Sequence, residues 1–269
     1  MTTQLKYSLL DPTGNITLLV ETPVPIEDQP AVALELMKQE PSAEQAGFVS
    51  FDDAGIHLRM AGGEFCGNAC MSAAALYRKR ARHSGCSTAQ EGSAVLVSVW
   101  GTAEPVPVRI NALADSIWEG RVQMPLPLSI GRELFPDGQM LPVVRFPGIT
   151  HVILEEAPDP VRAEALAGEW CRMLDTEALG LMFLNRKEHR LKPLVYVPAA
   201  GTLFWESSCA SGTTAVGAFL ALKAGSPVDL ALSEPGGTLS IAAEPSGRLL
   251  LSGYVQLLQS RTAVFDLQA

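Results

Sequence analysis

The sequence predicts an α+β fold in which short strands outnumber helices. Short runs rich in Val, Ile and Leu occur along the whole chain, and Gly, Pro, Asn or Asp bounds most of them. Four segments have helical character, and they are spaced too widely for a regular alternation of strand and helix. The 269 residues, 47% of them hydrophobic, are enough for one large domain or two small ones.

Eight runs have the apolar, β-branched composition of strands. The last of these runs is the longest. The predicted strands are Asn15–Glu21, Ser93–Trp100, Pro107–Asn111, Gly120–Met124, His151–Leu154, Leu194–Val197, Leu239–Ala243 and Leu249–Leu258.

Four segments have the spacing or the composition of helices. Gln29–Lys38 follows a proline-rich turn, and Pro160–Leu174 places charged residues between apolar ones at helical spacing. Gly67–Arg80 and Ala210–Ala224 are small and apolar nearly all round for their first three turns, and Gly225 ends the second. Because a helix without a polar face is usually buried, we expect these two helices to lie among layers of strands.

A cysteine precedes each of the two apolar helices. Cys66 stands in Phe-Cys-Gly-Asn-Ala and Cys209 in Ser-Cys-Ala-Ser-Gly, 143 residues further on. The same chemical group at the same local position in both halves of the chain indicates a duplicated fold. Packing in the core explains the other three cysteines, which are Cys70, Cys86 and Cys171.

A cysteine at the start of a helix lies beside unpaired backbone N–H groups and the positive end of the helix dipole, which favour the thiolate. The same N–H groups form a site for a carboxylate. If the two helix starts face each other across a small carboxylate ligand, one sulfur lies on each side of its α-carbon. A thiolate on one side then removes a proton and a thiol on the other side returns one, which inverts the carbon without a cofactor or a metal.

The net charge of −9 argues against nucleic acid and anionic membranes as partners, because both require clustered cations. No run approaches the ~20 apolar residues that span a bilayer, and no continuous apolar run of a signal peptide follows Lys6. Five dispersed cysteines fit a reduced, cytoplasmic compartment. The expected partner is therefore a small molecule, and the sequence leaves a homodimer open.

The segments Gly63–Ala69 and Ser208–Thr213 resemble the two cysteine motifs of the diaminopimelate epimerase family, whose members are cofactor-independent two-thiol isomerases. The resemblance implies two pseudo-symmetric α/β halves, each a mainly antiparallel sheet rolled around a central helix. One half would comprise residues 1–116, with a C-terminal strand at 256–269 returning to it. The other half would comprise residues 117–255.

By the same resemblance, Cys66 and Cys209 are the two acid and base thiols, and backbone N–H groups at the two helix starts hold the α-carboxylate of an amino acid. The candidate substrate-binding residues are Asn15, Gly67, Asn68, His151, Glu206, Ser211, Gly212 and Thr213. Glu64 and Glu206, which shortly precede the two cysteines, could bind the α-ammonium group or poise the thiols. His57 is a further candidate for contact with the substrate.

Three departures from the family pattern concern the distal end of the substrate. Ile149 and Ala178 stand where the diaminopimelate enzymes carry asparagines, and Tyr196–Ala199 stands where they have Tyr-Glu-Arg-Gly. These changes leave a distal ammonium and carboxylate without partners. The pattern is similar to the histidine racemase branch, which makes D-histidine for metallophores such as staphylopine. Aromatic residues near the motifs that an imidazole could contact are Phe65, Phe204 and Trp205.

Other functions remain open from the sequence alone. The same mechanism could act on diaminopimelate or on another amino acid. Cys209 with His151 as base is a pattern of thiol hydrolases. Cys66 and Cys70 with His57 or His151 could hold a metal, although their spacing is not CxxC. A binding protein that has lost catalysis is the alternative from a different class.

Overall fold

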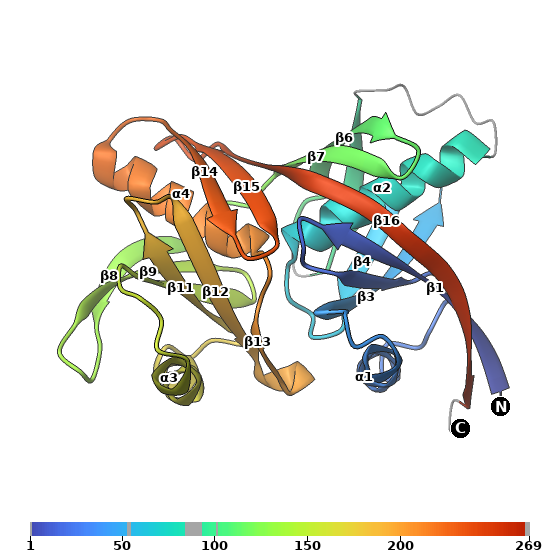
Figure 1. The fold of residues 1–269 in the computed structure, drawn as a ribbon, viewed down its shortest axis with the longest axis horizontal. Helices are drawn as coiled ribbons and strands as arrows, with labels where there is room; N and C mark the ends of the chain where they lie inside the picture. Colours follow the sequence, from blue (N-terminus) through green and yellow to red (C-terminus); the bar gives the residue numbers. More distant parts are fainter. Residues whose placement is uncertain (1, 53–54, 84–92, 101, 267–269) are drawn as a thin grey trace. The chain divides into compact units, whose positions relative to one another are not determined.

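The computed structural model describes residues 2–52, 55–83, 93–100 and 102–266. In this part of the chain it has four α-helices, one short 3-10 helix (Pro198–Ala200) and sixteen strands (Figure 1). The predicted mixture of helices and strands is confirmed. The chain divides into two compact units, one formed by Met1–Val122 with Gly253–Ala269 and the other by Gln123–Ser252.

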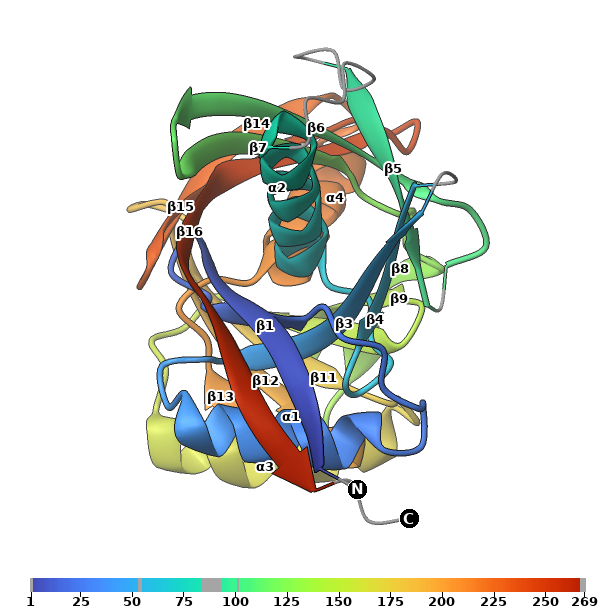
Figure 2. The same cartoon turned by 90° about the vertical axis from the view of Figure 1, so that its right-hand side faces the viewer.

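Eight strands, almost entirely within the first unit, form a closed barrel. They are neighbours in chain order, and the last strand closes the barrel by pairing antiparallel with the first over most of its length (Figures 1 and 2). These strands are β1 (Thr2–Pro12), β2 (Thr17–Val20), β3 (Gln45–Asp52), β4 (Gly55–Met60), β5 (Ala94–Val99), β6 (Val106–Ala114), β7 (Ile117–Gln123) and β16 (Leu249–Asp266).

Two helices of the first unit lie on opposite sides of β1 and β3 (Figure 2). Helix α1 (Gln29–Gln39) buries Val32 and Leu36 against apolar residues of β1, β2 and β3. Helix α2 (Gly67–His83) packs against all strands from β1 to β6, and its residues from Ala69 to Leu76 are buried. The small side chains of α2 permit this close packing on all sides, as its composition predicts.

The second unit is built on a mainly antiparallel sheet. Only β10 with β11 and β12 with β14 are parallel pairs among its described strands. The strands are β8 (Ser129–Leu134), β9 (Met140–Phe146), β10 (Ile149–Leu154), β11 (Leu179–Asn185), β12 (Arg190–Val197), β13 (Thr202–Trp205), β14 (Val228–Glu234) and β15 (Gly237–Ala243).

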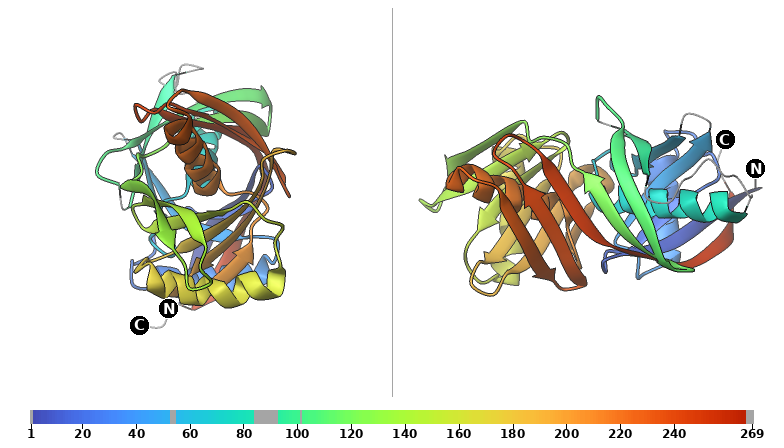
Figure 3. Two further views of the ribbon diagram at one scale, coloured as in Figure 1. Left: turned by 90° about the vertical axis from the view of Figure 1, so that its left-hand side faces the viewer. Right: turned by 90° about the horizontal axis from the view of Figure 1, so that it is seen from above.

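The sheet of the second unit carries a helix on each face (Figure 3). Side chains alternate along its strands, so Ile153 and Met182 pack in the cluster that contains helix α4 (Ala210–Ala224). Their neighbours Val152 and Leu181 pack with helix α3 (Pro160–Met173) on the other face. The start of α4 is thereby fixed against buried residues of β10 and β11.

No helix in the described part of the chain is long and apolar enough to cross a membrane.

Candidate functional site

Cys209 is the residue immediately before α4, and its backbone is extended with φ −130° and ψ 103°. Its side chain is 5% exposed. The backbone N–H of Cys209 donates a hydrogen bond to Glu234 Oε2 at 2.7 Å, and its Sγ lies 3.6 Å from Ser211 Oγ. The sulfur therefore sits at the start of a buried helix beside the Ser211 hydroxyl, and a carboxyl group binds the backbone of the same residue.

Glu234, the last residue of β14, supplies that carboxyl group. It is 5% exposed, and its Oε1 accepts a hydrogen bond from the hydroxyl of Thr213. Burial raises the pKa of Glu234 to about 8, against the lowering effect of the hydrogen bonds from Thr213 and Cys209. The sequence analysis did not identify Glu234.

The thiol of Cys209 is held in its protonated form. Burial raises its pKa well above that of an ordinary thiol, and the charges of Glu206 and Glu234 raise it further. Hydrogen bonds from Ser211 and the Gly212 backbone act in the opposite direction and are smaller. Burial and the two carboxylates therefore act on the pKa of Cys209 in the direction opposite to the helix start, which by itself favours a thiolate.

His151 lies on β10 with no exposed surface, and its Nε2 shares a 2.9 Å hydrogen bond with Ser211 Oγ. Its Nδ1 is buried without a hydrogen-bond partner among the described residues. Burial lowers the pKa of His151 to about 3, so the ring is neutral. His151 reaches Cys209 only through Ser211, which is not the direct pair that a thiol hydrolase uses.

Glycine makes this packing of His151 possible. Gly180 lies opposite His151 in the parallel pair of β10 and β11. A Cβ at Gly180 would lie 2.2 Å from His151 Nδ1, and a Cβ at Gly212 would lie 2.1 Å from Met182 Sδ and 3.2 Å from Cys209 Sγ. The backbone of both glycines therefore approaches the site more closely than any other residue would allow.

Cys66 precedes α2 in the first unit and is partly exposed. Its Sγ donates to Gln45 Oε1 at 3.1 Å and accepts from the backbone N–H of Ala69 at 3.4 Å. The amide of Gln45 in turn donates to Thr17 Oγ1 at 2.7 Å. A side-chain network from β2 and β3 thus orients the sulfur, and the sequence analysis did not identify Gln45 or Thr17.

Asn15 and Asn68 are both buried near this network, each with 1% exposure. Thr17 Oγ1 donates to the carbonyl of Asn15 at 3.0 Å, which links Asn15 to Cys66 through Thr17 and Gln45. The side chain of Asn15 donates to Glu44 Oε2 at 3.1 Å. Asn68 is the second residue of α2, directly after Gly67.

Three further acidic and histidine candidates are only partly associated with these clusters. Glu64 Oε2 is buried with no hydrogen-bond partner in the part of the chain that the structure describes, and burial raises the pKa of Glu64. Glu206 raises the pKa of Cys209 by its charge. His57 lies on β4 and pairs with Asp52 at 2.9 Å, so its partner is an exposed carboxylate rather than Cys66.

The aromatic candidates are placed differently from the expectation. Trp205 Nε1 donates to Glu164 Oε1 of α3 at 2.8 Å, and its ring lies 5.6 Å from that of Phe183, so it packs with α3. Cys209 belongs to the cluster on the opposite face of the sheet. The expectation that Trp205 lies by the second motif is therefore wrong. Phe204 is 37% exposed, and Phe65 is buried.

The remaining described cysteines are free thiols in the core. Cys70 has no exposed surface, and Cys171 Sγ donates to the carbonyl of Thr176 at 3.2 Å. Cys86 lies outside the described residues. In the described ranges no three His, Cys, Asp or Glu side chains are grouped so that they could hold a metal ion.

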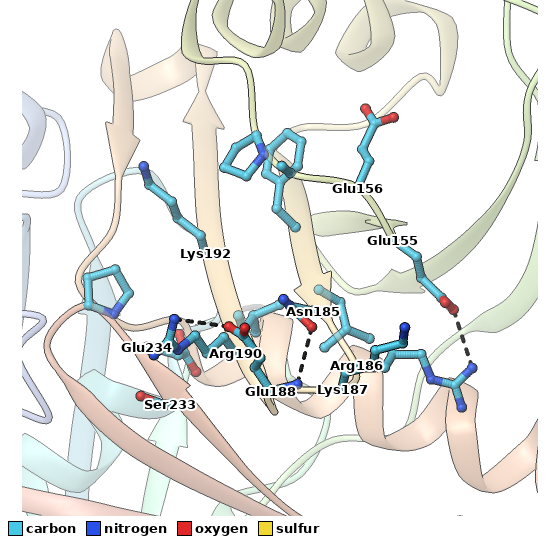
Figure 4. Close-up of a pocket in the computed structure, with 16 residues that line it drawn as sticks. Glu155, Glu156, Asn185, Arg186, Lys187, Glu188, Arg190, Lys192, Ser233 and Glu234 are labelled. Atoms are coloured by element: carbon cyan, nitrogen blue, oxygen red, sulfur yellow. Dashed lines mark hydrogen bonds and ion pairs between the residues drawn. The ribbon is translucent and has the colours of Figure 1, made fainter.

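A cavity of about 900 Å³ opens in the second unit between the β10–α3 connection, the hairpin of β11 and β12, and the end of β14 (Figure 4). Glu234 contributes to its wall. Exposed charged side chains at its mouth form ion pairs with one another, Glu155 with Arg186 and Glu188 with Arg190.

Residues 4–257 match the family model described as the histidine racemase CntK N-terminal domain. A histidine racemase of Fusobacterium nucleatum is 32% identical over 262 residues, which cover 94% of each chain. A predicted epimerase from Pseudomonas aeruginosa has a similar fold, with a TM-score of 0.70, 16% identity and coverage of 96% of this chain and 99% of that one. A hydroxyproline epimerase from Agrobacterium vitis, solved with trans-4-hydroxy-L-proline, gives a TM-score of 0.67 at 10% identity, with coverage of 98% and 93%.

These relatives confirm the resemblance on which the sequence analysis relied. The chain is an isomerase of the racemase and epimerase class that acts on amino acids. It belongs to the histidine racemase family.

Proposed function

We propose that this chain interconverts L- and D-histidine with two thiols, those of Cys66 and Cys209, and without a cofactor. The observation that carries the proposal is the matched position of the two cysteines, each directly before a buried helix with small side chains. The family supports a racemase, and no other described pair of cysteines has this placement.

The reaction follows from the position of each sulfur. A thiolate on one face of the α-carbon removes its proton, and a thiol on the other face delivers one, so the carbon inverts. Backbone N–H groups of Gly67 and Asn68 in one unit, and of Ser211 and Gly212 in the other, would stabilise the carboxylate as it takes on enolate character. Because Cys209 is protonated, it suits the role of the thiol that delivers the proton.

We further propose that the two compact units, Met1–Val122 with Gly253–Ala269 and Gln123–Ser252, are pseudo-symmetric halves, each a sheet around its apolar helix. Their boundaries lie six and three residues from the expected division into residues 1–116 with 256–269 and residues 117–255. Two observations support this proposal: α2 packs against six strands, and α4 packs against strands β9, β10, β11, β14 and β15.

Histidine is favoured over diaminopimelate by the residues that replace the distal binding groups. Ile149 and Ala178 are 4% and 1% exposed and belong to the apolar cluster under α4, so neither offers a hydrogen bond to a distal ammonium or carboxylate. The distal ammonium and carboxylate of diaminopimelate would lack hydrogen-bond partners, which costs about 1–3 kcal/mol for a polar group and more for a charged one. The D-histidine product would serve metallophore synthesis in the cytoplasm, where these thiols stay reduced.

The test is racemisation by three serine variants without added pyridoxal phosphate or metal. Cys66→Ser and Cys209→Ser should each abolish conversion of L-histidine, whereas Cys171→Ser, a matched core cysteine, should retain it. In competition, L-histidine should be consumed well before L,L-diaminopimelate. Activity in either active-site variant would contradict the two-thiol reaction, and preference for diaminopimelate would contradict the substrate. A chain that binds histidine but racemises no amino acid would be a binding protein.

A further inference from the structure

We propose that Glu234 is the positioning residue of Cys209: its buried carboxyl fixes the first turn of α4 and loses its proton before the sulfur does, so that Cys209 stays a thiol. The role of that thiol as proton donor rests on the proposed function, whereas the geometry does not.

One carboxyl group of β14 holds two points of the first turn of α4. Oε2 accepts from the backbone N–H of Cys209 at 2.7 Å, and Oε1 accepts from the hydroxyl of Thr213. The backbone beside the reactive sulfur is thereby tied to the end of a sheet strand. Because the N–H of Cys209 is already occupied, a substrate carboxylate has to be held by N–H groups further along, such as those of Ser211 and Gly212.

The charge that acts on both Cys209 and Glu234 is negative. Glu206, in the loop before α4, raises the pKa of both Cys209 and Glu234. His151, which reaches Cys209 through Ser211, is neutral because burial lowers its pKa. Two neighbouring buried groups do not ionise together, and burial raises the pKa of the Cys209 thiol well above its ordinary value while the pKa of Glu234 is about 8. The first proton to leave therefore comes from the carboxyl rather than from the sulfur.

Cations near Glu234 have other partners. Arg190 and Lys192 line the cavity that Glu234 also lines (Figure 4). Arg190 pairs with Glu188 at 3.0 Å, and Lys192 lies 4.7 Å from the ring centre of Trp205. Within the described residues Glu234 forms no ion pair, so no cation at contact distance offsets its charge when it ionises.

Glu234→Gln tests the proposal in the full chain. Glutamine keeps the shape and an acceptor for the Cys209 N–H but removes the charge. The readout is the rate at which iodoacetamide alkylates Cys209 between pH 6 and pH 11, followed by mass spectrometry of its peptide. We expect the midpoint to fall by about one pH unit or more, which is about tenfold faster alkylation at pH 9. Glu244→Gln, an exposed charge loss in the same unit, should leave the midpoint unchanged. An unchanged or higher midpoint in Glu234→Gln overturns the proposal.

A second measurement needs no variant at Glu234. Iodoacetate converts Cys209 into an anionic thioether, and iodoacetamide converts it into a neutral one of nearly equal size. Because coupling between two groups is reciprocal, the carboxyl carbon of Glu234, followed by carbon-13 NMR, should titrate at a higher pH in the anionic form. Equal midpoints would contradict the proposal.

Neither readout depends on racemisation. If the unmodified protein fails to racemise any amino acid while the midpoints shift, the proposed function fails and the role of Glu234 stands. If the unmodified protein racemises histidine while the midpoints stay equal, the proposed function stands and the role of Glu234 fails.

Discussion

Gly180→Ala tests the packing that holds His151 beside the start of α4. The new Cβ would lie 2.2 Å from His151 Nδ1, 2.7 Å from its Cε1 and 2.8 Å from Met182 Cε, whereas ordinary contact begins at 3.4 Å. The ring must therefore move by about 1.2 Å, yet His151 and Met182 have no exposed surface. Overpacking of this kind destabilises a protein by about 1–3 kcal/mol, and we expect the upper end because both neighbours are fully buried.

The assay is unfolding in guanidinium chloride followed by circular dichroism, together with the initial rate of racemisation. A loss of about 3 kcal/mol corresponds to a fall in Tm of roughly 6–12 °C for a chain of this size. Gly131→Ala is the matched control, since a Cβ there meets nothing within 4 Å. Removing the ring in His151→Ala should make the alanine at position 180 much less destabilising. If Gly180→Ala is as stable as Gly131→Ala, or the double variant gives no relief, the reasoning about this contact is refuted.

Three further predictions concern the same two clusters. His151 has a folded-state pKa near 3 against 6.5 when unfolded, so stability should fall as the pH drops from about 6.5 to 3. In urea unfolding, His151→Gln should lose less free energy of unfolding over this pH range than the unchanged protein does. Glu234 has a folded-state pKa near 8 against 4.5 when unfolded, so it retains its proton in the folded chain and stability should fall as the pH rises from about 4.5 to 8. Glu234→Gln should remove that decline, and a decline of equal size in the variant would refute the assignment. Gln45→Leu removes the acceptor of the Cys66 thiol and should slow racemisation about 10-fold or more with a smaller effect on Tm, whereas an unchanged rate would show that this hydrogen bond has no role.

Local signals were sufficient to predict the helices. The bounds Ala210–Ala224 were predicted and observed, because the glycine that ends the helix adopts the left-handed φ of 64° that its type allows. Helix α2 begins at Gly67 as predicted and extends three residues further, to His83. Small apolar composition also indicated that both helices are buried, and this is confirmed.

Strands with partners elsewhere in the chain were harder to predict. The first strand, β1, was missed because Lys6 and Ser8 interrupt its apolar pattern. Both side chains bond to Glu21, Lys6 at 2.9 Å and Ser8 at 2.8 Å, and this partner lies beyond the next strand. β8 was missed because it is an edge strand whose residues are largely exposed. The other strands that were not predicted are β3, β4, β9, β11, β13 and β14.

In the candidate site, too, residues brought in by sheet pairing were harder to predict than residues in short motifs. The two cysteines, Asn15 and His151 were predicted as site residues from short motifs, whereas Gln45 and Glu234, which form hydrogen bonds with the two cysteines, were not predicted. Gln45 is 21 residues from Cys66, and Glu234 is 25 residues from Cys209. Each lies on a strand whose position beside the helix is set by sheet pairing. Trp205 was misplaced because adjacent residues of a strand point to opposite faces, which sequence proximity does not reveal.

The most direct test of the two-thiol reaction is the location of deuterium at low conversion of L-histidine in heavy water. A thiol carries a single proton, so reversal on the same face returns the original hydrogen, whereas inversion delivers solvent deuterium from the opposite face. The account predicts D-histidine with one α-deuterium and recovered L-histidine with none. Deuterium entering the recovered L-histidine as fast as the product, or a product without deuterium, would contradict it.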